Sequence, residues 1–269
     1  MAGKDITTKP ITKNMNNMDE VKDRLFNVFG EAFKMIYVKG GTCVLGSSEY
    51  MISGQTGLFD GCTLHTTELK DYYIGESLVT ENLHKLVTGL TLKDKYARYP
   101  EVRGSSEHYP IVLGGICDIL YFIFKLNQIT GMNFRLPTLD EWEFAAKGGK
   151  KSLGYRYSGS NNIDEVAWYK GNSSEHIHPI KMKKPNELGI YDMTGNLLEY
   201  CACNFFDTNP NSWNNAYRTN MYGFEIYRGG CYGASAEECE ITFLDDWAQD
   251  WYECRGLRLC ISAKDVLIR

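Results

Sequence analysis

Apolar residues near the start of the chain recur at helical spacing. From Asn17, which has Glu20 three residues later as in a capping box, large apolar side chains follow at three- and four-residue intervals. This stripe consists of Val21, Leu25, Val28, Phe29 and Phe33. It predicts an N-terminal helix over residues 17–34, whose apolar face would pack on its own domain or on a second copy in a homo-oligomer. Residues 1–16 are polar and are expected to form a flexible segment.

The next segment has the short apolar runs and glycines that are typical of strands. Residues 35–38 and 42–45 flank a glycine pair at positions 40–41, and this pattern predicts a tight β-hairpin. Residues 69–74, with two adjacent tyrosines, predict another strand.

Helix signals dominate the middle of the chain. Thr80 is placed to cap a short helix that ends near Gly89. Residues 117–128 are apolar nearly all round, which predicts a buried helix. Thr138 and Glu141 form a capping box, so a further helix is expected to begin there. After residue 149 the chain is mostly irregular, and long irregular stretches in a compact domain tend to be functional.

Composition narrows the class of protein. With 269 residues, 43% of them hydrophobic and 23% charged, the chain is long enough for one large core. The net charge is −5 and no long Lys/Arg run occurs, which argues against nucleic acid as a partner. The first residues lack the apolar stretch of a signal peptide, and no apolar run is long enough for membrane insertion. Nine cysteines at irregular spacing predict thiols of a reducing cytoplasm rather than disulfides.

Several sequence motifs occur in a fixed order along the chain. The longest are RLPTLDEWEFAAKGG at residues 135–149 and PNELGIYDMTGNLLEY at residues 185–200. GGTCVLGS at residues 40–47 precedes them, and RGGCY at residues 228–232 and GLRL at residues 256–259 follow. The ordered set resembles the formylglycine-generating enzyme (sulfatase-modifying factor) family.

The resemblance carries an expectation for the fold. It implies an α+β, loop-rich single domain of C-type-lectin-like fold over residues 35–269, with a ligand-binding region at residues 228–260. The three arginines in these motifs, Arg135, Arg228 and Arg258, suit forked hydrogen bonds to backbone carbonyls in a fold with few regular ladders.

The resemblance also bears on catalysis. Enzymes of this family oxidise a substrate cysteine with two cysteines of their own. The second aligns with Cys239, but the first aligns with Ala234. Because two-thiol chemistry cannot run on one thiol, the chain is expected to be no enzyme and to require no cofactor. The alternative is a sulfatase-maturation oxidase, or another enzyme of the family, in which Cys231 or Cys254 supplies the missing thiol.

Non-enzymatic relatives suggest a binding role. They include the variable proteins of diversity-generating retroelements, which serve in phages or on bacterial surfaces and contact ligands through the segment that is residues 232–255 here. This window is rich in acids and aromatic anchors, which predicts a surface for a protein or carbohydrate ligand on a cell surface. The expected contact residues are Tyr232, Gly233, Ala234, Ser235, Glu237, Glu238, Glu240, Phe243, Asp245, Asp246, Trp247, Gln249, Asp250, Trp251 and Tyr252. In the alternative, Trp247 and Trp251 pack inward and the acids are only solvated. With no signal peptide, the chain is expected in the cytoplasm or as a virion component.

A metal site is the last expectation from the resemblance. Enzymatic relatives hold calcium at the turn that corresponds here to Asn196 and Glu199. Oxygen ligands on a tight turn suit Ca²⁺. The equally open alternative is that the two side chains tie the turn by hydrogen bonds.

Overall fold

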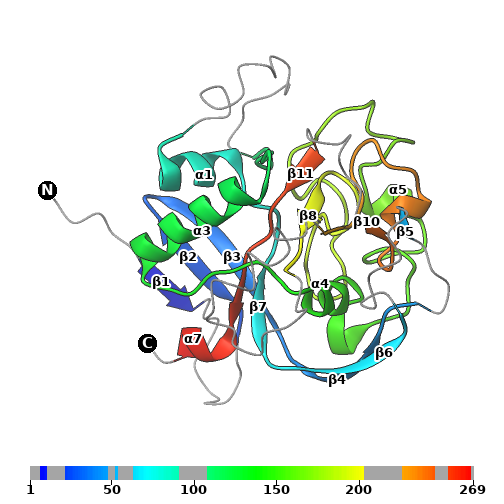
Figure 1. Ribbon diagram of the computed structural model, residues 1–269, viewed down its shortest axis with the longest axis horizontal. Coiled ribbons are helices and arrows are strands. Elements are labelled where there is room, and N and C mark those ends of the chain that lie inside the picture. The colour runs from blue at the N-terminus through cyan, green and yellow to red at the C-terminus, as the bar shows by residue number, and fades with distance from the viewer. Residues whose placement is uncertain are drawn as a thin grey trace, which may run out of the picture.

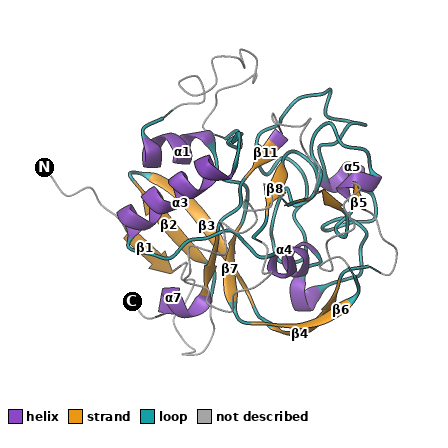
Figure 2. Ribbon diagram, viewed as in Figure 1, coloured by secondary structure: helices purple, strands orange, loops and turns teal. Residues whose placement is uncertain are grey.

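The computed structural model divides into a half with a sheet and helices and a half that is mostly loop (Figures 1 and 2). It describes residues 7–10, 22–47, 52–53, 63–90, 108–202, 226–245 and 254–267. Within these ranges, none of the helices has the length and apolar character needed to cross a membrane.

The first sheet forms the centre of the molecule. Its strands, all antiparallel to their neighbours, are β1 (Thr7–Pro10), β2 (Arg24–Val28), β3 (Glu31–Val38), β7 (Tyr72–Gly75) and β12 (Cys260–Ser262), in that order across the sheet. Because side chains alternate along a strand, neighbouring residues enter different cores. Met35 and Tyr73 join the core built with α1 (Glu81–Thr88) and α3 (Ile116–Thr130), whereas Ile36 and Tyr72 join the core built with α4 (Leu139–Ala146). The sheet is therefore covered on both faces.

Local capping signals fix the helices. Thr80 accepts a hydrogen bond from the Leu83 N–H at the start of α1 (Glu81–Thr88), and the predicted capping box of Thr138 and Glu141 starts α4 (Leu139–Ala146). The other helices are α3 (Ile116–Thr130), α5 (Ile163–Val166) and α7 (Ala263–Leu267), with 3₁₀ turns η2 (Gly149–Lys151) and η3 (Glu237–Cys239). The helix predicted at residues 117–128 is confirmed as α3, but it is buried on one side only, because Tyr121 and Phe124 are 40% and 39% exposed.

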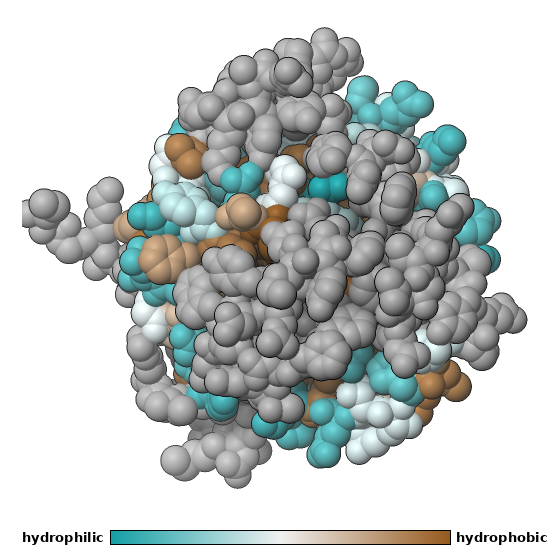
Figure 3. Space-filling view, in the orientation of Figure 1, coloured by the Kyte–Doolittle hydropathy of each residue, from teal (hydrophilic) through white to brown (hydrophobic). Residues whose placement is uncertain are grey.

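On the face of the molecule drawn in Figure 1, the described surface shows hydrophilic residues with a few hydrophobic patches among them (Figure 3).

The loop-rich half is held by a second sheet of very short strands. Their order is β11 (Arg255–Gly256), β8 (Leu198–Tyr200), β9 (Tyr227–Arg228), β10 (Leu244–Asp245) and β5 (Ile52–Ser53). A separate ribbon of β4 (Gly41–Leu45) and β6 (His65–Leu69) passes beside α4 (Figure 1). The first sheet is antiparallel throughout, and four of its five strands precede the helices in the chain, which confirms the predicted α+β class.

The predicted helix over residues 17–34 is wrong in its described part. Residues 24–34 form most of a β2–β3 hairpin, and its turn has positive φ at Phe29 and Gly30, as a two-residue hairpin turn requires. The apolar positions fit a helix as well as a strand, but only the hairpin brings Phe26 against Phe33 and Phe134. This segment is core of the domain itself, so it supplies no assembly helix. Residues 17–21 lie outside the described ranges.

Four further expectations are corrected by the sheet pairing. The glycines at 40–41 do not close a hairpin, because β3 pairs with β2 and β7 whereas β4 pairs with β6. The predicted strand at residues 69–74 is two strands, β6 and β7, in different sheets. The domain also begins before residue 35, since β1 and β2 belong to the first sheet. For the same reason Thr7–Pro10 is a strand within the segment that was expected to be flexible.

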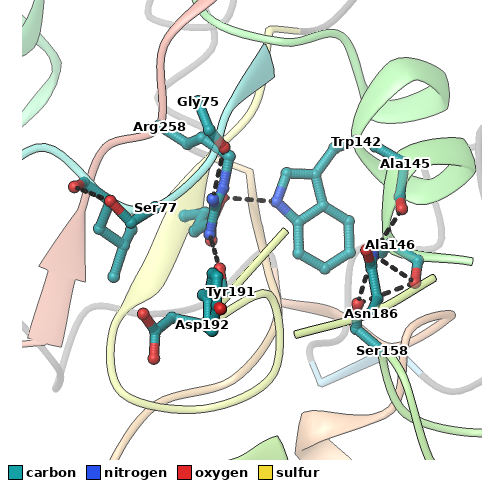
Figure 4. A network of polar contacts seen from close by, with 12 residues as sticks. Gly75, Ser77, Trp142, Ala145, Ala146, Ser158, Asn186, Tyr191, Asp192 and Arg258 are labelled. Carbon is teal, nitrogen blue, oxygen red and sulfur yellow. Dashed lines mark hydrogen bonds and ion pairs between the residues drawn. The ribbon is translucent and has the colours of Figure 1, made fainter. Parts of the chain in front are cut away.

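A buried ion pair joins the two halves of the fold. The Arg258 guanidinium donates two hydrogen bonds in a fork to the Glu199 carboxylate, with Nη2–Oε1 2.6 Å and Nε–Oε2 2.8 Å. It also donates to the carbonyls of Gly75 and Tyr191 at 2.8 Å each, while the Trp142 indole donates to Glu199 Oε2 at 2.7 Å (Figure 4). Arg258 and Glu199 are each 0% exposed. One guanidinium thus ties β7, β8, α4 and the turn at Tyr191 together.

We expect Arg258→Met to lower the free energy of unfolding by about 3–5 kcal/mol, because Glu199 would be left as a buried, uncompensated charge. Urea unfolding measures this. Adding Glu199→Gln should restore part of the loss, since the stranded charge is removed. Arg156→Met is the matched control: Arg156 pairs with Glu240 at the surface, and its loss should cost at most about 1 kcal/mol. Equal losses for the buried and the surface arginine would contradict the assignment.

Candidate ligand-binding surface

A buried arginine closes the base of the loop that was predicted to bind ligand. The chain leaves β9 at Arg228 and returns at β10, and Arg228 Nη1 donates to the carbonyls of Thr242 (3.1 Å) and Phe243 (3.3 Å). Its Nη2 donates to the Glu143 carboxylate on α4 at 3.1 Å, and Glu143 is also bound by Lys147 and by the Gly46 N–H. Burial alone would raise the pKa of Glu143, but Arg228 and Lys147 hold that pKa below its ordinary value. Both ends of the loop are therefore fixed to the core.

Backbone hydrogen bonds attach the loop to neighbouring segments. The Tyr232 N–H donates to the Asn196 carbonyl at 3.0 Å, and the Ser173 hydroxyl donates to the Tyr232 carbonyl at 2.7 Å. The Lys170 N–H donates to the Ala234 carbonyl at 3.0 Å. The loop thus has a defined position even though it contains almost no regular structure.

Individual residues of the predicted surface fall into distinct groups. Glu237 is exposed, and the partly exposed residues are Tyr232, Gly233, Ser235, Glu238 and Glu240. Ala234 and Phe243 are corrections: they are 6% and 8% exposed and belong to the core, so they cannot be contact residues. Asp245 lies in β10. The remaining predicted contact residues lie outside the described ranges; they are Asp246, Trp247, Gln249, Asp250, Trp251 and Tyr252. Both the predicted exposure of Trp247 and Trp251 and the alternative that they pack inward concern these residues.

Two of the acids in the loop already have local partners. Glu238 accepts from the Ser235 N–H at 2.7 Å, and the Glu238 N–H donates to the Ser235 hydroxyl at 3.3 Å, so the two residues are joined by reciprocal hydrogen bonds. Glu240 is paired with Arg156. Of the described acids in the loop, Glu237 is the exposed one, and its carboxylate also has the Ser235 side chain as a hydrogen-bond partner.

The cysteines of the loop are closed off from solvent. Cys239 is 0% exposed and its neighbour Cys231 is 2% exposed. Burial, with Cys231 as a further contribution, raises the pKa of the Cys239 thiol well above its ordinary value. The thiolate is the nucleophilic and metal-binding form, so this environment disfavours both roles. Cys231 and Cys239 come near each other, but neither sulphur is presented to a peptide.

An aromatic cluster beside the loop was not predicted. The Trp168 and His178 rings are stacked at 3.7 Å between centroids, and the Lys183 ammonium lies 4.0 Å from the centroid of Trp168. The indole nitrogen of Trp168 is buried without a hydrogen-bond partner. The only sequence signal for this cluster is the adjacent aromatic pair Trp168–Tyr169. His178 and Lys183 lie farther along the chain, so no local pattern predicts their contact with Trp168.

The turn expected to hold calcium is filled by protein contacts. Asn196 Oδ1 accepts from the His178 N–H at 3.1 Å, and its amide donates to the His178 carbonyl at 3.0 Å. Both oxygens of Glu199 accept from Arg258. A cation would have to compete with this guanidinium, so the two side chains as arranged do not fit a calcium site. Among the described residues, no cluster of three or more His, Cys, Asp or Glu could hold a metal.

Burial disfavours the ionised form of the Asp192 carboxyl. It is 4% exposed, and its Oδ2 accepts from the Lys181 N–H at 2.8 Å. Burial raises the pKa of Asp192 to about 6, against the opposing effects of the Lys181 N–H and Arg258. The folded protein therefore favours the neutral carboxyl more than the unfolded chain does.

Comparison with known proteins places the chain in a family. Residues 26–262 match the sulfatase-modifying factor enzyme 1-like domain, so the chain belongs to this family. It is similar to a protein named chaperone protein LppX from Paenibacillus barcinonensis, with 39% identity over 144 residues (47% of this chain, 48% of that protein). It is also similar to the inactive C-alpha-formylglycine-generating enzyme 2 of Bos taurus, with 35% identity over 81 residues (26% and 27%). These matches span at most about half of the curated relatives.

Among solved structures, Treponema denticola variable protein 1 matches almost throughout. The TM-score is 0.71 at 25% identity, with 89% of this chain and 99% of that chain covered. Together with the family match, this likeness confirms the C-type-lectin-like α+β fold of a single domain. Similarity to a variable protein and to an inactive relative fits a non-catalytic binding role.

We expect Asp192→Asn to stabilise the protein at pH 8 by about 1–3 kcal/mol, because the wild-type carboxylate is ionised there against its preference. The folded pKa is raised, so the wild-type penalty is full above pH 6 and declines as the pH falls toward the unfolded pKa. The gain from Asn should therefore shrink at pH 5. Urea unfolding at both pH values measures it, with exposed Asp164→Asn as the control. A gain that does not depend on pH would contradict the shifted pKa.

Proposed function

We propose that this chain is a non-catalytic binding protein that presents a ligand-contacting surface on the loop between β9 and β10 and on the segment that follows it. The observation behind the proposal is the structure of this loop. The ion pair of Arg228 with Glu143 fixes its two ends to the core, whereas residues such as Glu237 in its middle are exposed. Such a loop can change its exposed residues without changing the fold. The likeness to a variable protein over 89% of this chain supports the same reading.

The chemistry of the loop also supports a binding role over an oxidase. Ala234 stands where the resemblance places the first reactive cysteine, and Cys239 is buried with a raised thiol pKa. An oxidase that works through a thiol pair needs an accessible thiolate.

The ligand is best matched by a protein or carbohydrate on a cell surface. Tyr232 and Glu237 provide an aromatic body and an open carboxylate, which are suited to polar partners with hydrogen-bond donors or positive charge. We further propose that the protein is a phage or bacterial product whose binding residues are diversified by a retroelement.

The DNA around the gene tests diversification directly. We expect a reverse-transcriptase gene nearby, together with a near-copy of the codons for residues 228–260 that differs mainly at adenines. Exposed positions such as Glu237 should fall on differing codons, whereas buried Arg228 and Cys239 should not. A neighbouring sulfatase gene without such a copy would instead favour a maturation enzyme.

The second test concerns the reaction. The wild-type protein, supplied with copper, dioxygen and a cysteine-containing sulfatase peptide, is expected to yield no formylglycine by mass spectrometry. Ala234→Cys is the informative variant, because it restores the second thiol of the pair. Turnover by the wild type would refute the non-catalytic proposal, whereas turnover confined to the variant would assign the loss of activity to position 234.

A further inference from the structure

A lysine-rich cavity lies away from the β9–β10 loop. Its volume is about 450 Å³, and it is bounded by the residues just before β2, the end of β3, η2 and Leu188. Five of the residues that line it are lysines, namely Lys22, Lys34, Lys39, Lys150 and Lys151. Among the described residues of its wall Asp23 is the one acid, and none of these residues belongs to the loop of residues 229–243.

The positive charge of this cavity is only partly neutralised by the acids around it. Lys34 pairs with Asp23 (3.1 Å) and Glu76 (3.2 Å), and Lys39 pairs with Asp71 (2.9 Å). Lys150 and Lys151 on η2 are exposed. The ion pairs described at this cavity thus involve Lys34 and Lys39, and none involves Lys150 or Lys151, on a chain whose net charge is −5.

A glycine in the backbone leaves space for one of these lysine side chains. A Cβ atom at Gly41 would lie 2.9 Å from the Lys150 nitrogen, so the glycine leaves the space that the ammonium group occupies. Gly41 has φ +131, which side-chain-bearing residues rarely adopt. Assembling like charges costs free energy by mutual repulsion, and a multiply charged anion would remove that cost.

The rest of the wall is less polar. Tyr37 uses its hydroxyl to donate to Asp71, so its ring, with Val38 and Leu188, offers apolar surface. A volume of this size is in the range of small-molecule sites, which combine apolar walls with a few charged groups.

We propose that this cavity binds a small ligand that carries a multiply charged anionic group, either a phosphate chain or a set of carboxylates. The ammonium groups of Lys150 and Lys151 would contact the anion, and Leu188 would contact the less polar part of the ligand. Lysine binds such anions as a point charge with three donors. The proposal is independent of the function assigned to the β9–β10 loop.

Isothermal titration at physiological salt tests the site with inorganic tripolyphosphate and, separately, with citrate. We expect saturable binding of at least one anion at one site per chain. The double variant Lys150→Gln/Lys151→Gln should bind about tenfold more weakly, because two charge-assisted contacts are lost. The control is Lys85→Gln/Lys264→Gln, which removes the same charge from exposed positions on α1 and α7 that do not line the cavity.

Each outcome decides the proposal. Tighter binding of tripolyphosphate assigns the ligand to the phosphate class, and tighter binding of citrate assigns it to polycarboxylates. Absence of saturable binding by both anions overturns the proposal, and so does equal weakening by the two double variants, which would indicate diffuse surface charge. Circular dichroism should show both variants folded, since all four lysines are exposed. As a second variant, Gly41→Ala should weaken binding by displacing Lys150.

Discussion

The pairing of Arg258 with Glu199 is the interaction on which the rest of the structure depends. Both groups are completely buried, and besides binding each other they hydrogen-bond Gly75, Tyr191 and Trp142, which come from three separate parts of the chain. A fold in which many of the described residues lie in loops has few of the regular backbone ladders that usually satisfy buried polar groups. One guanidinium with five donors replaces several such ladder bonds, and it does so in a single fixed geometry.

The same device recurs twice more around α4. Arg228 with Glu143 closes the β9–β10 loop, and Arg135 with Glu141 joins the helix start to β12 through Cys260. Burial alone would raise the pKa of Glu141, but the guanidinium of Arg135 holds that pKa below its ordinary value. Glu141 and Glu143 lie on α4, and Glu199 lies in β8 of the second sheet. Because the arginines that bind them come from other segments, distant parts of the sequence are joined to these two elements. The exposed edge of the β9–β10 loop can then vary at little cost to stability, which suits a binding protein.

Charge is distributed unevenly over this frame. The β9–β10 loop carries acids, of which Glu237 is open to solvent, whereas the cavity beside η2 gathers lysines. The overall charge of −5 conceals this separation. Two surfaces of opposite charge on one domain would recognise chemically different ligands. The proposed binding role of the loop and the proposed anion site are therefore independent of each other.

The sequence alone determined the features that depend on interactions between residues close together in the chain. Thr80, Thr138 and Glu141 cap helices through neighbouring backbone groups, and the ordered motifs identified the family. Tertiary structure decided the rest. Residues 24–34 carry apolar residues at helical spacing, yet pairing with β7 and packing against Phe134 select the hairpin. Burial of Ala234 and Phe243, the cluster at Trp168 and the lysine cavity all depend on contacts between segments far apart in the chain, which no local pattern encodes.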